Sequence, residues 1–299
     1  MFHPELLKNK KILVTGGGTG LGKEIAGHYL ELGAEVAICG RREPVLRETA
    51  EGLMAQHGGT VTVHSVDIRD HQAVDAMIDT IWQQGPLTGL VNNAAGNFLS
   101  RTEDLSVNGF NAITNIVLHG TFYVTQSVGR RWLEAGLPGS IINILVTWIW
   151  TGGPFTVPSA MSKAGLAAMT KSLAVEWGNR GIRINGIAPG PFPTEGASKR
   201  LNLSTIRGQD SQDPAEQTPA VRVPLGRIGQ MRELTNLATF LMADGCDYLT
   251  GEIIAIDGGQ WLAGNGHSGH LASLGDAEWQ AIREAIQQTN AADKKLRTS

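Results

Sequence analysis

The sequence predicts an α/β fold in which a doubly wound parallel sheet forms a single domain over residues 1–299. Short apolar stretches of strand length alternate with longer helix-like stretches along most of the chain. A glycine-rich turn follows the first apolar stretch directly. Strands that alternate with helices form a parallel sheet with helices on both faces. Because 41% of the residues are hydrophobic, the chain has enough apolar material for a packed core.

The predicted elements follow one another in regular order. Strands are expected at residues 11–17, 34–40, 60–68, 89–96, 140–146, 182–190 and 251–259. Helices are expected at residues 21–33, 73–86, 104–132 and 159–181, with a further polar helix after the second strand. We find no internal repeat in this order, so the sheet is expected to be built once.

Two segments interrupt the alternation. Residues 191–223 are rich in Pro, Gly, Ser, Thr, Gln and Asp, and they are long for a connection inside a compact domain. Long connections of this kind are commonly lids over an active site, so we interpret the segment as a substrate lid. Residues 262–299 form a polar C-terminal extension with one amphipathic stretch, AEWQAIREAI.

Composition and charge exclude several classes of partner. The formal net charge is −3, and no basic stripe is present, which argues against nucleic acid. The longest apolar runs are too short to cross a membrane. The cysteine and histidine spacing predicts no metal site. The N-terminal stretch lacks the apolar core of a signal peptide, and LRTS at the end is no peroxisomal address, so we expect a cytoplasmic protein.

The stretch TGGGTGLG lies between the first predicted strand and the first predicted helix. Glycines at this place let the backbone approach a pyrophosphate at the helix N-terminus, where the amides and the dipole favour anions. A glycine turn without a ligand is the alternative. The predicted cofactor contacts in this stretch are Gly16, Gly17, Gly18, Thr19, Gly20, Leu21 and Gly22.

Two charged positions indicate which dinucleotide is bound. Arg41 and Arg42 stand where an acidic residue would bind the ribose hydroxyls of NAD. A guanidinium binds a 2′-phosphate instead, so the sequence favours NADP(H) as the cofactor. A solvated start of a helix is the alternative for both arginines. Asp67, at the end of the third predicted strand, is expected to contact the adenine, or else to act only as a cap of that strand.

Four motifs in order resemble the short-chain dehydrogenase/reductase family, whose fold is Rossmann-like. They are TGGGTGLG, NNAAG (92–96), SKAG around Lys163 and IAPG (187–190), and the resemblance covers roughly residues 8–262. NNAAGNF (92–98), FTVPSAMSKAG (155–165), AVEWG (174–178) and APGPFPTEGASKRL (188–201) are more narrowly similar to 2,4-dienoyl-CoA reductases. The resemblance implies that Lys163 binds the nicotinamide ribose. It also implies cofactor contacts at Asn93, Pro189, Gly190 and Phe192.

The chain departs from this resemblance at the position of the tyrosine that acts as the catalytic acid. Most of the family has a tyrosine where this chain has Ser159, and serine is normal there in the narrower group. That group places its tyrosine fifteen residues before the lysine, where this chain has Trp148. Its catalytic asparagine is kept as Asn97. We expect Asn97 and Trp148 to hold the substrate carbonyl together, whereas the alternative is that Trp148 only fills a narrower pocket.

An indole has limited chemistry at such a position. Its N–H donates hydrogen bonds only, so it is able to hold an oxyanion but not to act as a general acid. The sequence therefore predicts a weakened form of the reaction, with the carbon proton coming from water. His119 lies near the expected site and is a candidate for acid–base work, as imidazoles often are, although a structural role is more common for a lone histidine.

The resemblance also implies a small-molecule acyl-CoA substrate. By position, Arg69, Phe98, Ser106 and Arg200 match substrate contacts of the narrower group. A solvated loop charge is the alternative for Arg200. The implied function is NADPH-dependent reduction of 2,4-dienoyl-CoA thioesters in unsaturated fatty acid beta-oxidation. The alternatives are reduction of another carbonyl or enoyl substrate, or a non-catalytic NADP(H)-binding sensor or scaffold. The small-residue helix at 164–168 resembles a family interface, so a homotetramer is expected.

Overall fold

One parallel sheet organises the part of the chain that the structure describes. The computed structural model describes residues 1–194, 223–265, 275–277, 280–281 and 284. Seven strands pair in the order β3-β2-β1-β4-β5-β6-β7, and every pairing is parallel. The strands are β1 (Lys11–Thr15), β2 (Glu35–Gly40), β3 (Val61–Ser65), β4 (Gly89–Asn92), β5 (Gly139–Ile144), β6 (Ile182–Pro189) and β7 (Ile253–Ile256). The predicted doubly wound sheet is therefore confirmed.

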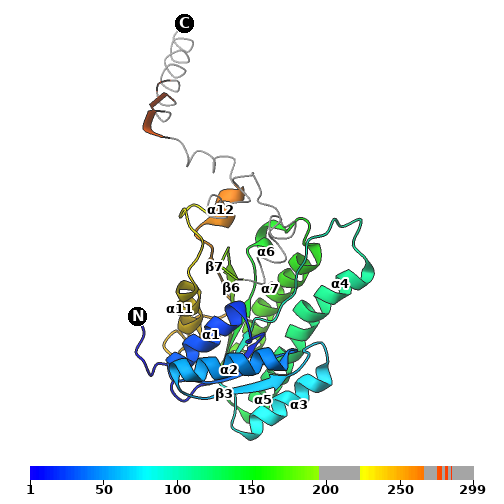
Figure 1. The fold of residues 1–299 in the computed structure, drawn as a ribbon, viewed down its shortest axis with the longest axis vertical. Coiled ribbons are helices and arrows are strands. Elements are labelled where there is room, and N and C mark those ends of the chain that lie inside the picture. Colours follow the sequence, from blue (N-terminus) through cyan, green and yellow to red (C-terminus); the bar gives the residue numbers. More distant parts are fainter. Residues whose placement is uncertain (195–222, 266–274, 278–279, 282–283, 285–299) are drawn as a thin grey trace.

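Helices cover both faces of the sheet (Figure 1). One face packs against α1 (Gly20–Glu31), α2 (Glu43–His57) and α11 (Met231–Met242). The other face packs against α3 (His71–Gln83), α5 (Thr121–Ala135) and α7 (Val157–Gly178). Three shorter pieces lie near the carboxyl ends of the strands: α4 (Val107–Thr114), α6 (Trp148–Thr151) and α12 (Gln260–Asn265). A π-helical turn, η1 (Asn115–Gly120), joins α4 to α5.

Alternation along the strands explains this two-sided core. In β1, Ile12 and Val14 belong to the cluster under α1, whereas Leu13 belongs to the cluster under α3 and α5. All three side chains are fully buried. Because successive strand residues point to opposite faces, each central strand feeds both layers. Full burial of one such side chain stabilises the fold by about 1.5–3 kcal/mol.

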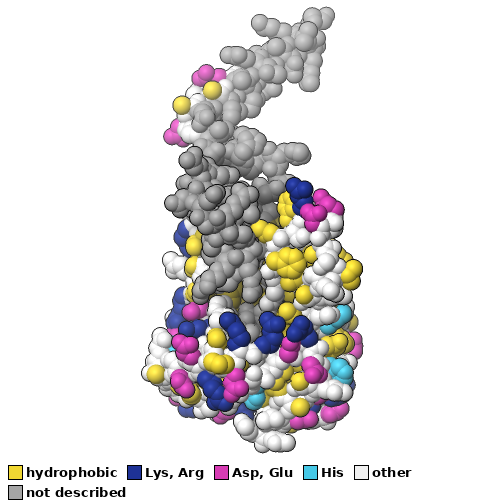
Figure 2. Space-filling view, turned by 45° about the vertical axis from the view of Figure 1, so that its right-hand side comes forward, with side chains coloured by type: hydrophobic (Ala, Val, Ile, Leu, Met, Phe, Trp, Pro, Cys, Tyr) yellow, Lys and Arg dark blue, Asp and Glu magenta, His cyan; other side chains and the backbone are white. Residues whose placement is uncertain are grey.

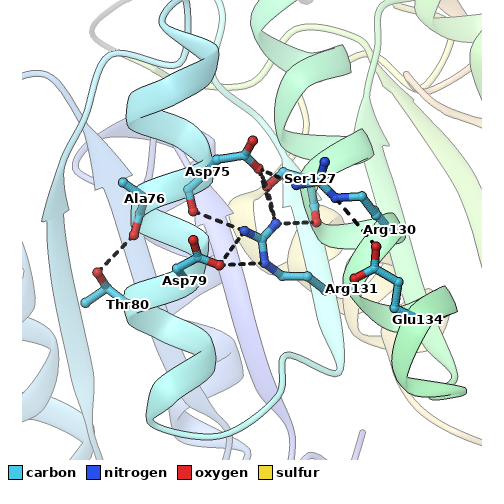
Figure 3. A network of polar contacts seen from close by, with 8 residues as sticks. All are labelled: Asp75, Ala76, Asp79, Thr80, Ser127, Arg130, Arg131 and Glu134. Atoms are coloured by element: carbon cyan, nitrogen blue, oxygen red, sulfur yellow. Dashed lines mark hydrogen bonds and ion pairs between the residues drawn. The ribbon is translucent and has the colours of Figure 1, made fainter.

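A polar network fastens α3 to α5 on one face (Figure 3). The Ser127 hydroxyl donates to Asp75 at 2.5 Å, and the Arg131 guanidinium donates to Asp79 at 2.5 Å. Arg131 also donates to the Ser127 carbonyl at 2.8 Å, so its side chain is largely covered. The Ser127 hydrogen bond and the nearby Arg130 and Arg131 lower the pKa of Asp75. This network joins the two helices on one face of the sheet.

Several predicted boundaries were wrong. The third strand ends at Ser65, so Asp67 lies in the turn after it rather than in the strand. The single helix expected over residues 104–132 is divided into α4, η1 and α5, and it starts at Val107. The start of the expected polar extension belongs to α12. Most of the expected lid, and most of the extension, lie outside the described residues.

Membrane spans and metal clusters are both absent from the described residues. None of the helices described here has the length and apolar character required to cross a membrane. Within the same part of the chain, histidine, cysteine, aspartate and glutamate side chains do not gather into a group able to hold a metal ion.

Candidate active site at the carboxyl edge of the sheet

The predicted site residues in the described part of the chain lie at one edge of the sheet. The glycine-rich turn follows β1, Asn93 and Asn97 follow β4, Trp148 follows β5, and Gly190 follows β6. In a parallel sheet all these places lie at the carboxyl ends of the strands. Because β1 is flanked by β2 and β4, the strand order reverses there, and ligands of such sheets bind at this reversal.

The glycine-rich turn is packed too closely for side chains at two positions. A Cβ on Gly17 would lie 2.6 Å from the Ile38 side chain. A Cβ on Gly22 would lie 2.4 Å from the side-chain nitrogen of Asn93 and 2.5 Å from the Gly16 carbonyl. Glycine at these positions allows the turn to lie against β2 and β4, which leaves its outer side open to a ligand.

Asn93 and Thr15 hold this turn in place. The Asn93 side-chain amide donates to the carbonyls of Thr15 and Gly16, at 3.0 and 3.2 Å. The Thr15 hydroxyl accepts from the backbone N–H groups of Asn93 and Ala94, both at 3.0 Å. In this structure Asn93 braces the cofactor loop, and a direct contact with the cofactor stays a prediction. The sequence analysis missed Thr15, although it is the first residue of the glycine motif.

The start of α1 fits a dinucleotide phosphate. Thr19 is the N-cap of α1, and its side chain makes no capping hydrogen bond. The first turn of α1 also contains no acidic residue. Its backbone N–H groups are therefore available to an anion, with the helix dipole adding to the attraction. Together with the close glycine packing, this arrangement fits a bound nicotinamide dinucleotide, which supplies a hydride when it is present.

Charged side chains gather beyond the ends of β2 and β3. The Arg69 guanidinium donates to both carboxylate oxygens of Asp67, at 2.9 Å to one and 3.0 Å to the other. This pairing lowers the pKa of Asp67, and the charge of Arg41 contributes to the shift. Arg69 was expected to contact substrate, and the structure places it against Asp67, close to the predicted cofactor residues. Arg41 is exposed directly after β2.

We expect Arg41→Ala to weaken NADPH binding without changing NADH binding. A hydrogen bond to a charged group contributes about 1.5–3 kcal/mol, so the KM for NADPH should rise about 10- to 100-fold. Steady-state kinetics with both cofactors measures the effect, and Arg47→Ala, at an exposed position on α2, is the matched control. An equal loss with NADH would show that Arg41 does not recognise the 2′-phosphate.

Lys163 is buried where α7 passes the end of β5. Its amine donates to the carbonyl of Ile144, the last residue of that strand. Only 4% of Lys163 is exposed, and this burial lowers the pKa of its amine to about 8. Ser159 is also buried, one helical turn earlier on α7. Both predicted side chains therefore occupy the same covered stretch of α7.

The lowered pKa of Lys163 predicts a pH limit on catalysis. Its charge is lost as the pH rises through about 8, so kcat/KM should fall above that pH. In Lys163→Arg the fall in kcat/KM above that pH should disappear, because a guanidinium stays charged. The maximal kcat/KM of this variant should be lower than that of the natural protein. Stability follows the opposite direction: between pH 8 and the unfolded pKa the unfolded chain binds more protons, so the free energy of unfolding rises with pH. If kcat/KM of Lys163→Arg falls at the same pH as in the natural protein, the fall does not come from Lys163.

Trp148 opens the short helix α6 immediately beyond β5. Its side chain is half-buried and lies over Gly153, where a Cβ would be 3.1 Å from the indole. Asn97 is also half-buried, and its side-chain oxygen accepts the Phe98 backbone N–H at 2.9 Å. The NH2 group of the Asn97 side chain takes no part in that hydrogen bond. The sequence analysis expected no helix at α6, which is only four residues long.

One backbone hydrogen bond joins the Asn97 loop to the segment after α6. The Ser100 N–H donates to the Phe155 carbonyl at 2.9 Å. Phe155 has a φ of 60°, which is unusual for a bulky residue, and its side chain is 58% exposed. Strain of this kind persists only where the surroundings hold it, and it occurs often at functional sites. This hydrogen bond thus links the loop that follows Asn97 to the segment between α6 and α7.

The remaining predicted contacts have different outcomes. Ser106 caps α4, where its hydroxyl accepts the Gly109 N–H at 3.0 Å, and the Phe98 ring packs against that same glycine. These two residues therefore meet at the start of α4. His119 bonds Asn115 within η1, at 3.0 Å. Arg200 lies outside the described residues.

The end of β6 is held by a residue that the sequence analysis missed. A Cβ on Gly190 would lie 2.6 Å from the Cβ of Asp257, which follows β7 directly. The Gly190 N–H also donates to the Ile256 carbonyl at 3.0 Å. Phe192 packs into the cluster of α1 and α11. An acidic residue between a strand and a glycine pair, as in IDGG, was the available signal for Asp257.

Comparisons with known proteins agree with this geometry. Residues 16–260 match the family described as Enoyl-(Acyl carrier protein) reductase. An uncharacterized oxidoreductase of Caenorhabditis elegans is 42% identical over 98% of this chain and 93% of its own length. A protein of the same organism named "Probable 2,4-dienoyl-CoA reductase" is 43% identical over 90% of this chain and 84% of its own.

One similar solved structure contains a bound cofactor. It is a gluconate 5-dehydrogenase of Burkholderia cenocepacia in complex with NADP and tartrate, 30% identical, with a TM-score of 0.77. The match covers 86% of this chain and 97% of the other. The residues that match the family model run from the glycine turn to the start of α12, so they include the whole sheet beyond β1 and the buried lysine on α7. The chain therefore belongs to the short-chain dehydrogenase/reductase family and resembles its 2,4-dienoyl-CoA reductases.

Proposed function

We propose that the protein reduces 2,4-dienoyl-CoA thioesters with NADPH, in unsaturated fatty acid beta-oxidation. The observation that carries the proposal is the 2.9 Å hydrogen bond from Ser100 to Phe155, which holds the Asn97 loop beside the Trp148 segment. The proposal takes the Asn97 amide and the Trp148 indole as two hydrogen-bond donors at the carboxyl edge of the sheet, where Lys163 donates to the last residue of β5. The relative named as a 2,4-dienoyl-CoA reductase, 43% identical, supports this choice of substrate.

The chain's own residues divide the work of this reaction. Asn97 and Trp148 donate N–H groups to the thioester oxygen, on which negative charge develops as the conjugated system is reduced. Lys163 would hold the nicotinamide ribose of a bound cofactor. Because an indole has no suitable pKa, the proton that completes the reduction at carbon comes from water. Ser159 lies one turn before Lys163 and lines the same stretch of α7.

The surface on the side of α3 and α4 suits a long substrate with an apolar part and a negatively charged part. Figure 2 shows hydrophobic side chains gathered on its upper part and a row of basic side chains across its middle. A CoA thioester has an apolar acyl chain and several phosphates, so it needs both kinds of surface. In this proposal Phe98 and Ser106 contact the thioester portion, and Arg69 and Arg200 contact the CoA portion.

The direct test measures NADPH oxidation with 2,4-hexadienoyl-CoA, beside the variant Trp148→Tyr. Turnover by the natural chain is the expected result, at a rate below that of the variant. Turnover by the variant alone would mean that the CoA site is intact but that the natural substrate is another carbonyl or enoyl compound. If neither the natural chain nor the variant turns over the substrate, while NADPH still binds in a fluorescence titration, a non-catalytic cofactor-binding protein would be favoured.

The role of CoA is tested separately with Arg200→Ala. Loss of one phosphate contact should raise the KM for the acyl-CoA about tenfold and leave the KM for a CoA-free thioester unchanged. Steady-state kinetics with the two substrates measures the difference. An equal effect on both substrates would remove the argument for a CoA contact at this position.

We also propose that the protein assembles as a homotetramer. Apolar side chains are exposed on the helices that would meet: Phe122 on α5 is 43% exposed, and Met161 and Val175 on α7 are 56% and 84% exposed. Light scattering of the purified protein measures the mass, and Val175→Glu should lower it. The cytoplasmic placement expected from the sequence stays a prediction, which cell fractionation tests.

A further inference from the structure

A stacked pair of tryptophans lies beside the proposed oxygen-binding position. Trp150 on α6 and Trp261 on α12 have ring centroids 4.7 Å apart and an interplanar angle of 28°. Trp150 lies two residues after Trp148 in the same helical turn. Figure 1 shows α6 and α12 at the same end of the molecule, although 111 positions separate the two tryptophans in the sequence. The stack therefore links the start of the C-terminal extension to the segment that carries Trp148.

Helix α6 is short and depends on its neighbours for its position. It is four residues long, and none of its side chains is fully buried. A single turn of this length is not stable on its own, because helix nucleation costs more than one hydrogen bond returns. Its packing is supplied by α7 and by α12. Stacked aromatic rings attract each other beyond the effect of the area they bury, so this contact matters for so short an element.

Trp261 is itself anchored firmly. Its backbone N–H donates to one carboxylate oxygen of Asp257 at 2.7 Å, and the Gly259 N–H donates to the other at 2.9 Å. Asp257 is 8% exposed and lies against Gly190, at the end of β6. A continuous series of contacts therefore runs from the β6 edge through Asp257, Trp261 and Trp150 to α6.

We propose that Trp261 is a positioning residue for catalysis, which holds the indole of Trp148 in place through its stack with Trp150. This inference rests on the proposed function, in which the Trp148 N–H holds the substrate oxygen. A donor of this kind must be held within about 0.5 Å of its productive place, and a displacement of about 1 Å can lower the rate about 100-fold. The indole N–H has a fixed direction on its ring, so the backbone of α6 must be placed correctly for it to reach the oxygen.

Kinetics provides the first test. Trp261→Ala and Trp150→Ala should each lower kcat about 10- to 100-fold, with the Kd for NADPH and the KM for acyl-CoA within about threefold of the natural values. Trp261→Phe, which keeps a ring to stack, should recover most of kcat. The double variant should lose no more than either single one, because both remove the same contact. Trp82→Ala on α3, another half-buried tryptophan, is the matched control.

A readout without turnover separates this inference from the proposed function. The protein contains seven tryptophans, and labelling with 5-fluorotryptophan gives each a 19F resonance, with Trp148 assigned from Trp148→Phe. The Trp148 resonance should shift or broaden in Trp261→Ala and stay unchanged in Trp82→Ala. An unchanged Trp148 resonance, or a kcat within about twofold of the natural value, would overturn the inference. If the natural chain reduces no dienoyl-CoA at all, the proposed function fails, and the 19F spectrum still decides whether Trp261 positions Trp148.

Discussion

Asn97→Ala should lower kcat for 2,4-hexadienoyl-CoA by roughly 100- to 1000-fold, the usual loss when one donor to a developing oxyanion is removed. The structure supports a large effect. The Asn97 oxygen already accepts the Phe98 N–H, so the amide nitrogen is the end that we expect to donate to the substrate. The indole that is expected as the second donor has a single N–H, so it does not replace the missing contact. Steady-state kinetics over a range of substrate concentrations measures kcat and KM separately.

Two further variants of asparagine sharpen this test. Asn97→Asp should be at least as damaging as Asn97→Ala, because a carboxylate repels the charge that develops on the substrate oxygen. Asn108→Ala, on the exposed side of α4, should leave kcat unchanged and serves as the matched control. A kcat in Asn97→Ala equal to that of the natural chain would mean that Asn97 does not hold the substrate oxygen.

Trp148→Tyr should raise kcat, by about 100-fold. A phenol both donates a hydrogen bond and has an ionisable proton, and a positioned general acid contributes about 100- to 10,000-fold to a rate. Trp148→Phe should act in the opposite direction and lower kcat about 100-fold, because it removes the N–H and keeps the aromatic ring. The two variants together distinguish a hydrogen-bonding role from a packing role for this residue.

A packing role for Trp148 predicts a different result. If the indole only fills space over Gly153, the variant Trp148→Phe should retain the natural rate, and the change should appear in stability rather than in kcat. Trp82→Tyr and Trp82→Phe, at a position on α3, control for the general effect of replacing an indole. Thermal unfolding of all four variants shows whether any loss of rate follows from a loss of folded protein.

The layout of the sheet could be predicted from local sequence because it depends on local patterns. Apolar runs of strand length and the positions of glycines determine where strands end, and parallel order places those ends at one edge. The family resemblance assigned Asn97, Trp148 and Lys163 to one site with the glycine turn, and in the structure these residues follow neighbouring strands or lie on α7.

Contacts between distant segments could not be predicted in this way. The stack of Trp150 on Trp261 depends on how two short helices meet, and neither helix is long enough to show a period in the sequence. Arg69 was assigned to substrate by resemblance, whereas its pairing with Asp67 depends on a turn of the backbone two residues away. The π-helical η1 breaks a predicted helix where the apolar pattern gives no sign of an extra residue.

The position of β1 in the sheet affects how the protein folds while it is being synthesised. β1 pairs with β2 on one side and with β4 on the other, where the Lys11 N–H bonds the Thr88 hydroxyl 77 residues later in the chain. At about 5–20 residues per second, the ribosome needs about 4–15 s to supply that partner. During this interval one edge of β1 has no neighbour, and an unpaired edge is a template for pairing with other chains. Nascent chains of this protein should therefore be most prone to aggregation, and most dependent on chaperones, before β4 emerges.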